Sequence, residues 1–102
     1  MLALKPSCEH CARALPPESP EARICSFECT FCRSCVEEVL SNVCPNCGGG
    51  FVPRPIRPRE DRVGGNSVRR FPPSADSVHR PLDLERQAAL VAVLGEIPPE
   101  AR

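Results

Sequence analysis

Apolar residues recur at helical spacing near the middle of the chain and again near its end. In the middle, the capping-box form Ser34-Cys35-Val36-Glu37 begins a run in which one helix face is apolar: Val36, Val39, Leu40 and Val43. This pattern predicts a helix from about Ser34 to Ser41. Residues 82–97, LDLERQAALVAVLGEI, combine good helix formers with Asp83 near the start and Gly95 at the left-handed C′ position. They predict an amphipathic C-terminal helix.

Short segments that suit β-strands precede and follow the first helix. Ala22-Arg23-Ile24 and Thr30-Phe31 predict a hairpin, and Phe51-Val52 could add a further short strand. The apolar helix face and four other side chains supply nearly all of the available core: Ile24, Phe27, Phe31 and Phe51. A core of this size is too small to fold the segment without further support.

Residues 48–81 interrupt these patterns with five Gly and six Pro among 34 residues. A segment with so few backbone donors and no apolar periodicity predicts an extended or disordered linker. The chain therefore divides into a cysteine-rich module at residues 5–57, a Pro/Gly/Arg-rich linker at residues 58–81 and the helix at residues 82–97.

The composition indicates what replaces a larger core. The chain has 102 residues with only four Phe, no Trp and no Tyr, but eight Cys, all between residues 8 and 47. Domains this small commonly depend on metal ions or disulfides. No stretch approaches the ~20 apolar residues of a membrane span, and Met1–Pro6 does not suit a secretory signal. We therefore expect a cytoplasmic protein, in which reducing conditions favour metal binding over disulfides.

The cysteines form four close pairs with the spacing C-x2-C-x13-C-x3-C-x2-C-x2-C-x8-C-x2-C. Two such pairs can make one tetrahedral thiolate site, so four pairs predict two Zn²⁺ per chain, although thiolates alone do not exclude iron. The pairs combine in three ways: sequential, nested or interleaved. We favour the interleaved one because it joins both long intervals into one body. It assigns Cys8, Cys11, Cys32 and Cys35 to site 1, and Cys25, Cys29, Cys44 and Cys47 to site 2. His10, inside the first pair, is an alternative ligand.

Two resemblances rest on these motifs. CTFCRSCVEEVLSNVCPNCG resembles a RING finger with Cys29 where that family usually has His. The stretch from Lys5 to Arg57, with KPSCEHCARALPPES, ICSFECTFC and VCPNCGGGFVPRPIR, is more similar to a short bacterial cysteine-rich family known as domain of unknown function 1272. The resemblances imply a bacterial origin, zinc binding and a small metal-stabilised α+β fold. This would be a RING-like or treble-clef two-zinc module with a short hairpin and one helix, followed by the linker and the C-terminal helix.

The RING resemblance suggests a ubiquitin ligase, but the sequence departs from the ligase pattern. Ala12 stands where ligase-type RING fingers usually have Ile or Leu, and Gly48 stands where they often have a basic residue. No arrangement of nucleophile and base is visible, and four thiolates leave an ion no open position for water. We expect structural zinc sites without catalytic activity.

The expected function is a zinc-binding protein-interaction module of unknown biological role. The apolar face of residues 82–97 either packs back on the module or binds a protein partner or a second copy of the chain. One alternative is nucleic-acid binding, because residues 51–81 carry seven Arg against three acidic residues, with Arg54, Arg57 and Arg59 foremost. However, thiolate-bound zinc would make the whole chain acidic. Another alternative is thiol redox chemistry or metal handling.

Overall fold

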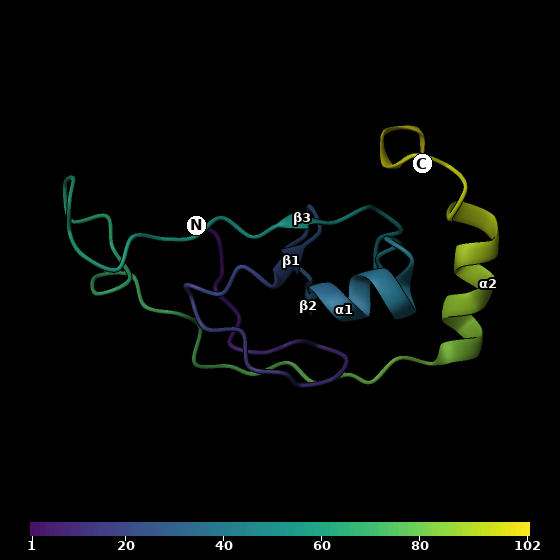
Figure 1. The fold of residues 1–102 in the computed structure, drawn as a ribbon, viewed down its shortest axis with the longest axis horizontal. Coiled ribbons are helices and arrows are strands. Elements are labelled where there is room, and N and C mark those ends of the chain that lie inside the picture. The colour runs from purple at the N-terminus through teal and green to yellow at the C-terminus, as the bar shows by residue number, and fades with distance from the viewer.

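The computed structural model describes residues 1–102 as a small α+β fold with a three-stranded sheet and two main helical segments (Figure 1). In chain order the elements are β1 (Ala22–Ile24), β2 (Thr30–Cys32), α1 (Arg33–Cys35), the π-helical turn η1 (Val36–Leu40), β3 (Val52–Pro53), α2 (Leu84–Leu94) and the 3₁₀ turn η2 (Pro99–Ala101). Neither helical segment has the length and apolar character that a membrane span requires.

The sheet has the strand order β2-β1-β3, and both neighbours of β1 are antiparallel to it. In β1, Arg23 pairs with Phe31 of β2 on one side and with Pro53 of β3 on the other. The predicted hairpin and the third short strand are therefore confirmed. Because β3 follows the last cysteine pair, it closes the cysteine-rich module back on its first strand.

The first helix is confirmed within one residue of its predicted start, but its capping box is wrong. The strand β2 runs directly into α1, so Cys32 is the N-cap and its side chain makes no capping hydrogen bond. Ser34 already lies inside the helix and cannot cap it. The turn η1 ends where Ser41 and Asn42 adopt left-handed backbone conformations, with φ of 48° and 58°.

The core contains sulfur as well as hydrocarbon. Six of the eleven residues in the main buried cluster are cysteines, packed around Phe31, Val36 and Leu40. The Phe51 ring meets the Phe31 ring edge-on, with centroids 5.5 Å apart. Phe27, expected in the core, is 75% exposed because it lies in the turn between β1 and β2.

Two core residues lie outside every predicted element. Leu4 and Leu15 are each 1% exposed, in segments that flank the first cysteine pair. The Leu15 N–H donates to the Pro6 carbonyl at 2.8 Å, which brings the two flanking segments together. The first pair is therefore supported by a buried loop closure that no apolar periodicity indicates.

Residues 58–81, expected as a linker, contain no helix or strand but are hydrogen-bonded to the N-terminal segment (Figure 1). The Ser74 N–H donates to the Leu4 carbonyl at 2.9 Å, and the Arg80 N–H donates to the Glu9 carbonyl at 2.7 Å. The hydroxyls of Ser7 and Ser77 are 2.8 Å apart. We call residues 58–81 the strap, because their second half runs along the N-terminal segment and carries the chain to α2.

The Arg54 side chain supports the loops rather than facing solvent. It is 3% exposed, and its guanidinium donates to the carbonyls of Lys5, Leu15 and Pro16 at 2.9, 3.1 and 3.0 Å. Burial, together with the charge of Arg57, lowers the pKa of Arg54. Arg57 donates to the carbonyls of Leu2 and Phe71 at 2.8 and 2.7 Å. Two of the three arginines that the sequence offered to nucleic acid are therefore bonded to protein carbonyls.

Helix α2 packs back on the module through one face. Its only buried residue, Gln87, donates through Nε2 to the carbonyls of Leu40 and Val43 at 3.3 and 3.0 Å. Leu84 and Val93 remain 60% and 68% exposed. Asp83 caps the helix as expected, but Gly95 has a right-handed φ of −60°, so the predicted left-handed C′ glycine is wrong. The chain instead leaves α2 by a further tight turn, in which the Ile97 N–H donates to the Leu94 carbonyl.

Replacing Arg54 with Met is expected to lower the free energy of unfolding by about 3 kcal/mol, because three carbonyls lose a charged donor. Urea unfolding of the metal-loaded protein measures this change. Arg62→Met, at an exposed arginine, is the control and should leave stability nearly unchanged. Equal stability of the two variants would show that the Arg54 contacts are not needed.

Replacing Gln87 with Glu is expected to loosen α2, because a carboxylate cannot donate to the Leu40 and Val43 carbonyls. Amide hydrogen exchange within α2 should rise about tenfold or more, while exchange in β1 and β2 stays the same. Glu85→Gln, on the exposed side of the same helix, is the matched control. Unchanged exchange in Gln87→Glu would contradict a docking role for Gln87.

Candidate metal centre

The first and last cysteine pairs fold as the same turn. In the Cys8–Cys11 turn, the N–H of the residue after the second cysteine, Ala12, donates to the Cys8 carbonyl at 3.0 Å; in the Cys44–Cys47 turn, Gly48 donates to the Cys44 carbonyl at 2.8 Å. Both donors have left-handed backbones, with φ of 63° at Ala12 and 76° at Gly48. Glycine adopts this conformation freely, whereas at alanine it costs roughly 1–2 kcal/mol. The turns bring each pair of sulfurs to one side of the backbone.

The two middle pairs are placed by the hairpin and the helix. Cys25 and Cys29 lie in the turn between β1 and β2, where Glu28 is left-handed and the Phe27 N–H donates to the Cys25 Sγ at 3.4 Å. Cys32 ends β2 and Cys35 lies one helical turn further on, in α1. A three-residue separation puts two helical side chains on the same face. The hairpin therefore holds the second pair at its turn and the third pair at the end of β2.

Four sulfurs converge in the first cluster, which we call cluster 1: Cys8, Cys11, Cys32 and Cys35, all within 4.8 Å of one another. Cys11 is exposed and the other three are buried. The Cys11 and Cys32 sulfurs are 3.7 Å apart. With Zn–S bonds of about 2.3 Å, two sulfurs of a regular tetrahedron are about 3.8 Å apart. Cluster 1 therefore has dimensions that suit a zinc ion.

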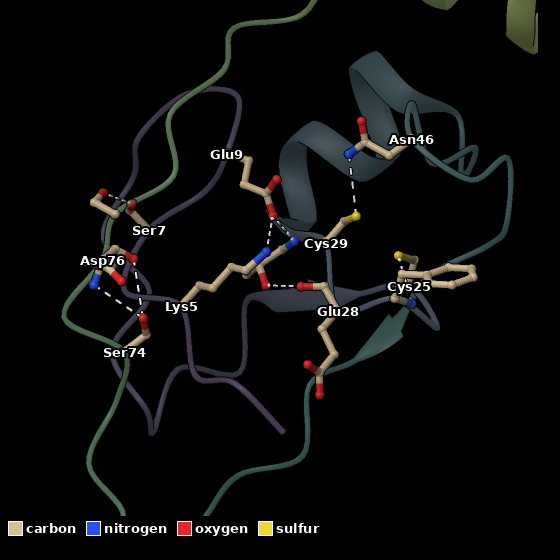
Figure 2. A network of polar contacts seen from close by, with 12 residues as sticks. Lys5, Ser7, Glu9, Cys25, Glu28, Cys29, Asn46, Ser74 and Asp76 are labelled. Atoms are coloured by element: carbon tan, nitrogen blue, oxygen red, sulfur yellow. Dashed lines mark hydrogen bonds and ion pairs between the residues drawn. The ribbon is translucent and has the colours of Figure 1, made fainter. Parts of the chain in front are cut away.

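Three sulfurs form the second cluster, cluster 2, from Cys25, Cys44 and Cys47, again within 4.8 Å of one another. Cys29 lies beside this cluster: its sulfur accepts from the Nδ2 of Asn46, which stands between Cys44 and Cys47, at 3.4 Å (Figure 2). The four pairs thus meet in alternation, the first with the third and the second with the fourth. Seven of the eight sulfurs lie in the two groups, and the eighth adjoins the second.

Burial opposes ionisation of several of these thiols. It raises the pKa of Cys35, and the sulfurs of Cys32 and Cys8 raise it further. Burial also raises the pKa of Cys29 and of Cys44. At Cys25 burial acts in the same direction, but N–H donors from Phe27 and Cys29 outweigh it and lower the pKa. A buried divalent cation offsets the repulsion of clustered thiolates, so its binding displaces protons from these groups.

Two residues inside the cysteine pairs hold the clusters in place, and the sequence reasoning missed both. Glu9 is buried, and its carboxylate accepts from the Thr30 N–H of β2 and from the Lys5 ammonium (Figure 2). Asn46 donates to Cys29. The only feature of the sequence that could have indicated them is their position between two paired cysteines, because such residues lie close to a bound ion.

His10, the alternative ligand, belongs to neither cluster. Its Nδ1 accepts from the Leu82 N–H at 3.0 Å, and its carbonyl is 3.1 Å from the Nε2 of His79. Both contacts join the first cysteine turn to the end of the strap and the start of α2. In this structure His10 therefore connects two parts of the chain.

The fold and the clusters together define a small cysteine-rich α+β domain with two groups of thiols that could hold metal ions. The chain belongs to the family described as Protein of unknown function (DUF1272), which matches residues 1–57. An uncharacterized protein of Rhizobium meliloti (strain 1021) is 48% identical over 81 residues, 79% of this chain and 89% of that protein. Since 81 residues exceed the matched module, this similarity continues into the strap. No solved structure matches the chain.

Replacing Cys29 with Ser tests whether it completes cluster 2. We expect one of two metal ions to bind at least about 100-fold more weakly, because a lost ligand should cost more than the 10–100-fold of a lost supporting contact. Competition with a chromophoric chelator measures the affinity, and Co²⁺ absorption reports the thiolates bound. Ser26→Ala, in the same turn, is the control. Full affinity for both ions in Cys29→Ser would exclude Cys29 as a ligand.

Proposed function

We propose that this protein is a structural two-zinc module of RING-like or treble-clef type, with one ion in each cysteine cluster, and that it serves as a protein-interaction module. The observation that carries the proposal is the alternation of the cysteine pairs between the two clusters. With this pairing, neither ion can bind without joining segments that are far apart in the sequence. The sites therefore suit a role in holding the fold.

Energetics support this structural role. A Zn²⁺ ion in a small domain contributes an apparent binding energy of about 10–16 kcal/mol, whereas whole domains are stable by about 5–15 kcal/mol. Only 20 of the 102 residues are buried, and six of the buried residues are cysteines. One ion would thus contribute about as much as the net stability of a whole domain, so its loss should unfold this one.

The donor set supports zinc and an inert site. All eight cysteines are free thiols, so all are available as ligands. Four sulfurs close a tetrahedral ion against water or substrate, which is typical of structural rather than catalytic zinc. Because free thiols persist under reducing conditions, we place the protein in the bacterial cytoplasm and assign it no enzymatic activity.

The interaction surface that we propose lies on the part of α2 that the module leaves uncovered, where Leu84 in the first turn and Val93 in the last turn are apolar and exposed. Burying such residues is the usual driving force for association with a protein partner or with a second copy of the chain. Binding of nucleic acid has less support, because the guanidinium groups of Arg54 and Arg57 are already hydrogen-bonded.

Native mass spectrometry of the purified protein is expected to find two Zn²⁺ per chain. Addition of a zinc chelator under reducing conditions should unfold residues 8–47, with loss of dispersed NMR signals, and added Zn²⁺ should restore them. Reductant without chelator is the control and should change nothing. An ordered, fully reduced protein that holds no stoichiometric metal would overturn the proposal.

A further inference from the structure

A cavity of about 350 Å³ lies where residues 80–90 meet the Cys44–Cys47 turn and the side chains of Glu9 and Phe31. Its walls come from the Cys44–Cys47 turn, from the end of the strap and from the first turns of α2, and its lining includes Phe31. Figure 1 shows α2 facing this end of the module, with the strap leading to it. The volume lies at the lower end of the range of about 300–1,000 Å³ that is usual for small-molecule sites.

Four charged side chains line the cavity, and the two acidic ones are already engaged. The Glu9 carboxylate accepts from the Lys5 ammonium and the Thr30 N–H. The Asp83 carboxylate accepts from two N–H groups at the start of α2, both at 3.1 Å. Neither carboxylate therefore needs a cationic ligand.

The two guanidinium groups of the cavity, those of Arg80 and Arg86, have no polar partner. Each residue makes its hydrogen bond through the backbone: the Arg80 N–H donates to the Glu9 carbonyl, and the Arg86 N–H donates to the Asp83 carboxylate. Neither takes part in an ion pair. A guanidinium presents a planar fork of donors that matches a carboxylate or a phosphate.

The remaining walls combine the apolar side chains of Phe31, Leu82 and Leu90 and two prolines with the amides of Asn46 and Gln87. Such a lining favours a ligand that has an apolar body as well as an anionic head. Because Lys5 neutralises Glu9, Arg80 and Arg86 against Asp83 leave the cavity one net positive charge, which a single negative charge on the ligand balances. A monoanion is therefore favoured over a dianionic phosphate.

From these features we infer that the cavity is a binding site for a small organic monocarboxylate with an apolar body, whose carboxylate is bound by Arg80 and Arg86. This assignment goes beyond the proposed structural zinc sites. It assigns ligand binding to the C-terminal half of the chain, which supplies no metal ligand. The cavity depends on the docking of α2, so ligand binding should also slow the amide exchange of that helix.

Benzoate is the probe, titrated into the full-length, metal-loaded protein and followed by NMR. We expect saturable shifts at residues that line the cavity, with a dissociation constant of about 1 mM, as suits so small a ligand. Benzamide, which is neutral, should give no saturable shift. Phenyl phosphate distinguishes the anion class: tighter binding than benzoate would overturn the assignment to a monocarboxylate.

Arg80→Gln and Arg86→Gln should each weaken benzoate binding about tenfold, as expected for the loss of a charged hydrogen bond. Both side chains are exposed, so the fold should persist, and Arg62→Gln, at another exposed arginine, should bind as the parent does. Metal content is measured for every variant, which separates a lost ligand site from a lost ion. No saturable shift with benzoate, or equal affinity in all three variants, would overturn the inference.

Discussion

The convergence of alternate cysteine pairs is the constraint on which the rest of the structure depends. Because the first pair meets the third and the second meets the fourth, the hairpin between them is fixed at its turn and at the end of β2. Cys32 has three structural roles, since it ends β2, precedes α1 and belongs to cluster 1. A strand register, a helix start and a thiol position therefore cannot change independently here.

In the loops of this protein, buried polar side chains supply the hydrogen bonds that backbone ladders supply in helices and strands. Backbone groups that are buried in irregular segments still need partners, and most of this chain is irregular. Arg54 supplies donors to three carbonyls near the first cysteine pair, Gln87 supplies donors to two at and after the end of η1, and Glu9 accepts from β2. No buried side-chain N or O atom lacks a partner. A chain with little secondary structure thus keeps a defined shape through a few side chains of long reach.

The features that the sequence predicted are those that local spacing controls. Helical periodicity located the two helices, and short strand-like runs located the hairpin and β3. Apart from the two helix ends at Ser34 and Gly95, the wrong or missing features depend on contacts between distant segments. Phe27 is apolar yet exposed in a turn, whereas Leu4 and Leu15 are buried without periodicity. An arginine in a Pro-rich segment suggests solvent or phosphate, and only the three-dimensional fold shows that Arg54 lies among carbonyls.

The two halves of the chain contribute different interactions to the structure. The cysteine-rich half contains the thiols. Burial raises the pKa of several of them, so they ionise less readily without a cation. The C-terminal half adds no thiol, but through the Leu82 N–H, Gln87 and Arg102 it hydrogen-bonds to three parts of that module: His10, the residues after the helix, and Gly48. Each of these contacts lies within or beside a segment that carries a cysteine pair. Leu82 and Gln87, which make two of these contacts, also line the cavity with the unpartnered arginines, so the order of the metal-binding half and the shape of that cavity depend on shared interactions.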